Sequence, residues 1–176
     1  TSWEALSEDA TAWRFELSRE ATFHEGRPVT AADVIASINY HRREGSTSAA
    51  KPLLADVADI RADGDHAVIF EMIAGNADLP WLVSDFHLVI QPAKPDGGIE
   101  WENGIGCGPY RVAEFQPGIR GAFERHDGWH RADEGAWFDV IEMTVLNDPN
   151  ARQTAIVTGD VDAVTDIDLK TADLLA

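Results

Sequence analysis

The sequence is poor in cysteine and in basic residues. A single cysteine, Cys107, excludes an internal disulfide and a cysteine-based zinc site. The 14 lysines and arginines face 31 aspartates and glutamates, which gives a net charge of −17. Such a surface repels phosphate backbones and anionic lipid, so we expect neither nucleic acid nor a membrane surface as a partner. No apolar run reaches the roughly 18 residues that a membrane-spanning helix needs.

The chain also lacks the usual signatures of nucleotide binding and covalent catalysis. Gly106 and Gly108 are not followed by the third glycine or the lysine of a phosphate-binding loop, and they indicate a backbone turn. Cys107 lies between them, where a small turn residue is a simpler interpretation than a nucleophile. No catalytic triad or carboxylate dyad can be composed from the spacing. We therefore expect no cofactor and no enzymatic activity.

Histidines are the remaining candidates for metal binding. His24 stands beside Glu25 at a turn, but no third ligand follows at a defined spacing. His126 and His130 are four residues apart, as in a helical metal pair, yet Gly128 argues against a helix there. Structural roles are favoured, and no metal site is expected. A small autonomous metal-dependent hydrolase using His24, His126 and His130 is kept as the alternative, and a stand-alone interaction module as a third possibility.

The most informative stretch that is present runs from residue 13 to 42. Apolar and polar side chains alternate over residues 13–18, which predicts a strand with one buried face. A glycine turn follows. Thr30 then offers a hydroxyl N-cap, and Asp33 stands three residues later at the positive end of a helix. The predicted buried positions of that helix are Val34, Ile35 and Ile38.

The rest of the sequence predicts alternating strands and helices of the α/β class. A glycine-rich stretch over residues 96–108 marks an internal boundary. Strand, helix and strand after it predict a right-handed parallel βαβ unit in a mixed sheet. Before this boundary we expect a hairpin of Val57–Ala62 and His66–Met72, a short apolar element at Leu79–Val83 and a buried strand at Phe86–Ile90. After it we expect paired strands at Tyr110–Phe115 and Gly121–His126, a strand at Phe138–Leu146, and a helix that starts at Asp148-Pro149 and stops at Gly159. An extended segment at Val161–Val164 and helical character at Leu169–Ala176 complete the prediction.

Several of these stretches, in this order, resemble one known family. The matching segments are residues 13–17 (WRFEL), 22–34 (TFHEGRPVTAADV), 106–110 (GCGPY), 123–129 (FERHDGW) and 147–162. Their wording is similar to that of the peptide-type solute-binding proteins of bacterial ABC importers, extracellular solute-binding family 5. This family includes oligopeptide-, dipeptide- and nickel-binding proteins. The chain departs from the pattern at Cys107 and His126, where the family usually has threonine and asparagine, and it is far shorter than the family's members.

The resemblance implies a fold and a cellular role. The chain would be a partial lobe of a type II periplasmic binding protein fold, with residues 1–105 as the inserted subdomain of the first lobe. Residues 106–164 would belong to the main sheet of that lobe, and residues 165–176 would lead toward the hinge and an absent second lobe. The whole protein would capture a peptide or similar small solute for import. We expect ABC permease subunits as partners, a monomeric full-length protein, and a periplasmic or lipid-anchored extracellular location. The first residues carry neither a basic n-region nor an apolar h-region, so we expect no signal peptide within these 176 residues.

Three residues are the candidates for ligand contact: Trp81, Phe86 and His87. Ligand pockets are mostly apolar with a few placed polar groups, which suits this set. In the resembling family this segment runs near the cleft, and His87 stands roughly where nickel-type members have a basic ligand contact. Ser84-Asp85 would break the chain and expose its neighbours. A position in the core stays equally open for Trp81.

Overall fold

Two antiparallel sheets organise the fold. The computed structural model describes residues 2–166. Its strands are β1 (Trp3–Ala5), β2 (Ala12–Glu16), β3 (Val57–Ala62), β4 (Ala67–Met72), β5 (Tyr110–Gln116), β6 (Arg120–Arg125) and β7 (Val140–Thr144). The first sheet has the order β1-β2-β4-β3 and the second β5-β6-β7. The helices are α1 (Ala31–Arg42), α2 (Leu79–Leu82) and α3 (Pro149–Thr158), with 3-10 turns η1 (Lys51–Leu54) and η2 (Ala132–Glu134).

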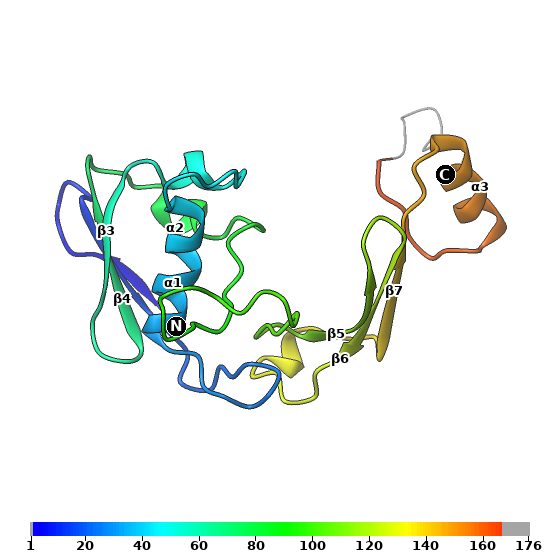
Figure 1. Cartoon of the computed structure of the whole chain (residues 1–176), viewed down its shortest axis with the longest axis horizontal. Helices are drawn as coiled ribbons and strands as arrows, with labels where there is room; N and C mark the ends of the chain where they lie inside the picture. Colours follow the sequence, from blue (N-terminus) through cyan, green and yellow to red (C-terminus); the bar gives the residue numbers. More distant parts are fainter. Residues whose placement is uncertain (1, 167–176) are drawn as a thin grey trace.

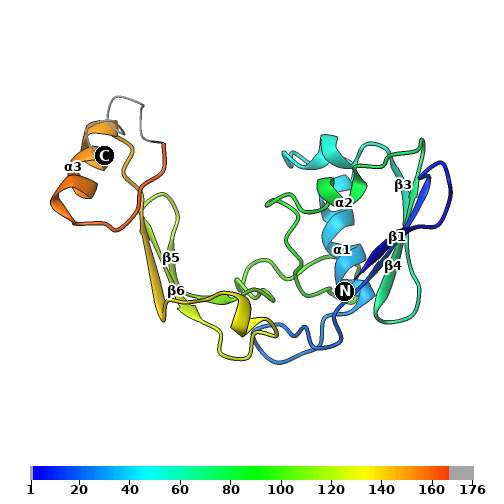
Figure 2. The same ribbon diagram turned by 180° about the vertical axis from the view of Figure 1, so that it is seen from behind.

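The two sheets lie in separate parts of the molecule. We call residues 2–105, with the first sheet, the first body, and residues 106–166, with the second sheet, the arm. In Figure 1 α1 packs beside β3 and β4, while the second sheet leads away from them and carries α3 at its far end. The view from behind in Figure 2 shows the same separation. None of the helices in the described part is long and apolar enough to cross a membrane.

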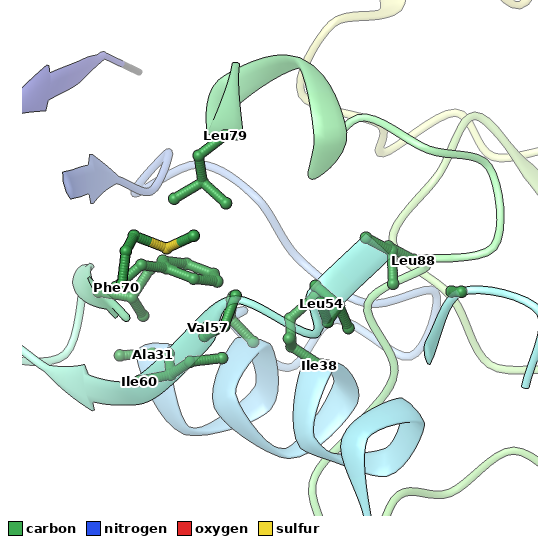
Figure 3. Packing of buried hydrophobic residues seen from close by; sticks show 12 residues of the cluster. Ala31, Ile38, Leu54, Val57, Ile60, Phe70, Leu79 and Leu88 are labelled. Carbon is green, nitrogen blue, oxygen red and sulfur yellow. The ribbon is translucent and has the colours of Figure 1, made fainter. Parts of the chain in front are cut away.

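The hydrophobic core lies between α1 and the first sheet. Ala31 and Ile38 of α1 share one buried cluster with Ile60 and Phe70 of the sheet. Figure 3 shows Ala31 beside Ile60, and Ile38 beside Leu54 of η1. Phe70 also meets Phe15 edge-on, with ring centroids 5.3 Å apart. Leu79 of α2 closes the same cluster and is completely buried. Side chains that are removed from water in this way supply most of the stability of a domain of this size.

The start of α1 is held by a buried carboxylate. Asp33 is 1% exposed and accepts hydrogen bonds from the backbone N–H and the hydroxyl of Thr30, both at 2.8 Å. It also accepts from the Arg27 guanidinium at 2.7 Å and from the backbone N–H of Ala93 at 2.8 Å. Burial alone would raise the pKa of Asp33, but these hydrogen bonds outweigh it and hold the pKa below its ordinary value. One carboxylate thus caps α1 and fastens the distant loop at Ala93.

Most of the expected elements are confirmed. The alternation at residues 13–18 forms β2, and the helix capped at Thr30 is α1. The expected hairpin is the β3–β4 pair, and the paired strands of the second half are β5 and β6. The Asp148 carboxylate accepts from the Ala151 N–H at 2.9 Å to cap α3. Gly159 ends α3 in the left-handed region, at φ +75°.

The predicted buried strand at Phe86–Ile90 is wrong. These residues form turns and irregular structure, and only Leu88 is buried. The Asp85 carboxylate accepts the backbone N–H of His87 at 2.9 Å, which curls the chain at the position where a strand would begin. The apolar run therefore buries Leu88 in the core and packs Ile90 against it, whereas Phe86 and Val89 are exposed.

The α/β class is confirmed, but the parallel βαβ unit is wrong. Every strand pair among residues 2–166 is antiparallel, and Val161–Val164 forms no strand. After α3 the backbone N–H groups of Asp160 and Val161 bond to the Ala155 carbonyl at 2.9 and 3.4 Å. These bonds turn the chain back on the end of the helix instead of pairing it with β7. The expected helix at Leu169–Ala176 lies outside the described residues.

Candidate ligand-binding surface

The short helix α2 places Trp81 on the surface. Its neighbour Leu79 is completely buried in the core, whereas Trp81 is 81% exposed. The Ser84 hydroxyl donates to the Trp81 carbonyl at 2.7 Å and so helps to end the helix. The core alternative for Trp81 is therefore wrong. Its indole is available for contact with another molecule.

Phe86, five residues after Trp81, is exposed and forms a second unit with the partly exposed His87. Their ring centroids are 3.9 Å apart with the planes tilted by 32°. The Asp85 carboxylate lies 2.7 Å from Nδ1 of His87 and accepts its backbone N–H. These hydrogen bonds, the backbone one first, lower the pKa of Asp85. The carboxylate thereby orients the imidazole, and Phe86, 80% exposed, covers one face of it.

Together these residues make what we call the aromatic surface: Trp81, Phe86, His87 and Val89. Val89 is also more than half exposed, while Leu88 between it and His87 is buried. The structure brings Phe86 and His87 into contact, but no ring contact joins Trp81 to them among the described residues. Such a surface offers apolar area and one imidazole, which is suited to binding.

The three histidines of the hydrolase alternative do not converge. His24 and His126 meet edge-on, with ring centroids 5.2 Å apart. His130 is not in this pair and contacts the Trp129 ring instead. Within residues 2–166 no group of three histidine, cysteine or carboxylate residues could hold a metal ion. The structure gives the hydrolase no support.

His24 has a structural task that occupies both ring nitrogens. The backbone N–H of Gly106 donates to Nδ1 at 3.2 Å, and Nε2 donates to the Gly108 carbonyl at 3.2 Å. Burial lowers the pKa of His24 and so favours the neutral ring, and the nearby His126 acts in the same direction. A neutral imidazole here clamps the link between the first body and the arm. This agrees with the structural role that the sequence favoured for His24.

Cys107 is placed between these two glycines and is half-buried. Its thiol faces the Ile90 carbonyl, with sulfur and oxygen 3.9 Å apart. Burial raises the pKa of the thiol, which keeps it protonated and a poor nucleophile. Cys107 therefore belongs to the link between body and arm.

The α/β fold and the sequence motifs agree with one known family. The family model described as "Bacterial extracellular solute-binding proteins, family 5 Middle" matches residues 1–176. The chain belongs to this family, and the resemblance read from its motifs is confirmed.

Individual relatives agree with this assignment. The chain is 27% identical over 173 residues to the "Probable peptide ABC transporter periplasmic-binding protein" of Sinorhizobium fredii, covering 89% of this chain and 32% of the relative. It is 27% identical over 156 residues to the "HTH-type transcriptional regulator SgrR" of Pectobacterium atrosepticum, covering 83% of this chain and 24% of that protein. The solved structure of AgaA from A. tumefaciens R10 with agropinic acid superposes with a TM-score of 0.81 at 24% identity, covering 92% of this chain and 33% of that one. The chain thus spans about a third of the length of such relatives.

Proposed function

We propose that this chain is part of the first lobe of the substrate-binding component of an ABC importer. The observation that carries the proposal is the family match over residues 1–176, together with an exposed aromatic surface. The whole protein would capture a peptide or a similar small solute between two lobes and deliver it to ABC permease subunits. It would act as a monomer, in the periplasm or on a lipid anchor outside the cell.

Within that lobe we assign parts to the two regions of the fold. Residues 1–105 would form the inserted subdomain and residues 106–164 the main-sheet part, with residues 165–176 leading toward the hinge. The exposed apolar side chains of the arm support this assignment, because a partial lobe leaves uncovered what the rest of the protein would bury. Phe115 and Met143 are examples, at 65% and 60% exposure.

The aromatic surface is the proposed ligand contact of this chain. Trp81 and Phe86 would pack against apolar parts of the solute, and His87, oriented by Asp85, would supply a hydrogen bond. The net charge of −17 supports a solute rather than nucleic acid as the ligand.

The test is to identify what the full-length protein carries. The protein is purified from the exported fraction of its host, denatured with acid, and the released small molecules are measured by mass spectrometry. We expect a peptide or other small solute in roughly stoichiometric amount, released by the native protein and absent from a Trp81→Ala, Phe86→Ala double variant. The proposal would be contradicted if the exported protein carried no solute and bound none when solutes were added back.

A second candidate comes from the relative that is named as a transcriptional regulator. On this second proposal, the chain would be the solute-contacting part of a longer regulator, in which another part would bind DNA. Cell fractionation separates the two candidates: an importer component is exported, whereas a regulator stays with the nucleoid. Full-length protein that is found only in the cytoplasm and retained by DNA would favour the regulator.

A further inference from the structure

A pocket at the end of α1, separate from the aromatic surface, has no part in the function proposed above. Its volume is about 570 Å³, within the range of small-molecule sites. The lining comes from the last turn of α1, the loop after it, and η1 with the start of β3. The lining residues are Arg42, Ser46, Thr47, Ser48, Lys51, Pro52, Leu54, Ala55 and Val57.

The pocket combines an apolar floor with a hydroxyl wall. Leu54 and Val57 are buried in the core beneath it, at 2% and 3% exposure. On the wall, the Ser48 hydroxyl lies 2.6 Å from Nδ1 of His41, and the Ser46 hydroxyl accepts the backbone N–H of Ser48 at 3.3 Å. These bonds fix the loop, so the pocket has a defined shape.

The two cations of the pocket belong to the smaller group of basic side chains without a carboxylate partner, together with Arg19, Arg43 and Arg152 among residues 2–166. Most described basic side chains have a carboxylate partner within 4.0 Å; these are Arg14, Arg27, Arg61, Lys94, Arg111, Arg120, Arg125 and Arg131. Arg42 and Lys51 both line the pocket, and neither has such a partner among residues 2–166. The carboxylate that acts on Arg42 is that of Asp59, which lies beyond 4.0 Å.

Arg42 and Lys51 each have N–H groups that are not used in their hydrogen bonds within the protein. Arg42 donates from Nη1 to the Asn39 side chain at 2.8 Å, and from Nη2 to the carbonyls of Val57 and Ala58. Its Nε–H is unused in these bonds. Lys51 donates to the Arg43 carbonyl at 3.2 Å, which leaves further protons on its ammonium group. The contact between Lys51 and the Arg43 carbonyl places a cation at the C-terminus of α1, where the helix dipole favours it. The carbonyls that Arg42 contacts belong to β3, so Arg42 also ties the end of α1 to that strand.

We propose that this pocket binds a small organic carboxylate. The carboxylate would lie between Arg42 and Lys51, where a guanidinium and an ammonium group offer charge-assisted hydrogen bonds. A short apolar chain would lie along Pro52 and Ala55, the exposed apolar residues of the lining. The pocket shares no lining residue with the aromatic surface.

The test is an NMR titration of the isotope-labelled protein with hexanoate, at constant ionic strength. Hexanamide, which has the same chain and no charge, is the matched ligand. We expect saturable shifts of the backbone amides of residues 46–48 and 51 with hexanoate and none with hexanamide. Lys51→Gln should weaken binding about tenfold, the usual effect of losing one charge-assisted hydrogen bond. Lys94→Gln should leave it unchanged, because Lys94 pairs with Glu102 instead.

Lys51→Met serves as a second variant, since it keeps the aliphatic stem and removes only the charge. It should weaken hexanoate binding as much as Lys51→Gln does, with the remaining amide spectrum unchanged. The proposal is overturned if hexanoate gives no saturable shift, if hexanamide binds equally well, or if both Lys51 variants bind as the parent does. Titration with inorganic phosphate decides the chemistry of the anion: binding tighter than that of hexanoate would overturn the carboxylate assignment.

Discussion

The first body and the arm differ in how much apolar surface each one buries. Apart from Ala155, every buried apolar side chain among residues 2–166 belongs to the first body. The arm instead displays large side chains, among them Phe115, Trp137 and Phe138, each at least 65% exposed. The first body therefore carries its own core, whereas the arm is a hairpin-based sheet whose apolar face needs a cover. This contrast fits our proposal that the first body is a subdomain and that the arm is an incomplete part of the main sheet.

The largest expected effect comes from emptying the core of the first body. Phe70→Ala should destabilise the 176-residue chain by about 3–5 kcal/mol, because a buried aromatic ring leaves a cavity. Phe115→Ala on the arm should change stability by less than about 0.5 kcal/mol. Urea unfolding followed by far-UV circular dichroism measures both. Equal costs for the two variants would mean that the arm is covered in solution and that the contrast is false.

A smaller effect is expected at the carboxylate that fastens the loops of the first body. Asp33→Asn should cost about 2–3 kcal/mol, because it leaves the Arg27 guanidinium without its partner and weakens the bond to Ala93. The pKa of Asp33 is lowered in the folded protein, so its contribution is present above the unfolded value near 3.8 and is lost as the pH falls through the folded value.

The measurement is the urea midpoint of parent and variant between neutral and acidic pH. The difference between them should shrink as the pH falls below about 4, the ordinary range of an aspartate. A difference that stays constant through this range would show that Asp33 acts through shape and not through its charge.

The smallest effect is expected at the link between the two regions. The pKa of His24 is lowered by burial, so the folded protein takes up its proton less readily than the unfolded chain does. The stabilising contribution is present at neutral pH and is lost as the pH falls from the ordinary value of 6.5 through the folded value.

Protonation would also abolish the bond from the Gly106 N–H to Nδ1 of His24. Hydrogen exchange at Gly106, corrected for intrinsic rates, should therefore accelerate in mildly acid solution, with core amides of β4 unchanged. His24→Gln should remove this pH dependence. An acceleration that persists in the variant would show that His24 is not its cause.

Local patterns predicted local structure well. The alternation around Trp13 and Phe15, the cap at Thr30 and the stop at Gly159 each depend on a few neighbouring residues, and each is found in the structure. Elements that form only when they pair with a segment distant in the sequence could not be predicted from neighbouring residues. A short apolar run such as Phe86–Ile90 does not reveal whether a neighbouring strand exists, and here Asp85 curls the chain instead.

The same division holds for the candidate surface. Ser84-Asp85 interrupts the apolar run and so makes Phe86 and His87 candidates for ligand contact. The structure shows both near the surface and in contact with each other. That Trp81 points outward could not be read from the sequence, because an apolar residue in a short helix may face either way. The bond from the Ala93 N–H to Asp33 spans 60 residues and involves a backbone group, so no side-chain pattern indicated it.

The central claim is that the aromatic surface of the first body contacts the transported solute. The most direct test is the affinity of the full-length protein for its solute, measured by calorimetry for three variants. Trp81→Ala and Phe86→Ala should each weaken binding about tenfold or more, as buried aromatic anchors do. Trp3→Ala, which removes another indole that is 62% exposed in the first body, should leave it unchanged. Undiminished affinity in both Trp81→Ala and Phe86→Ala would contradict the account.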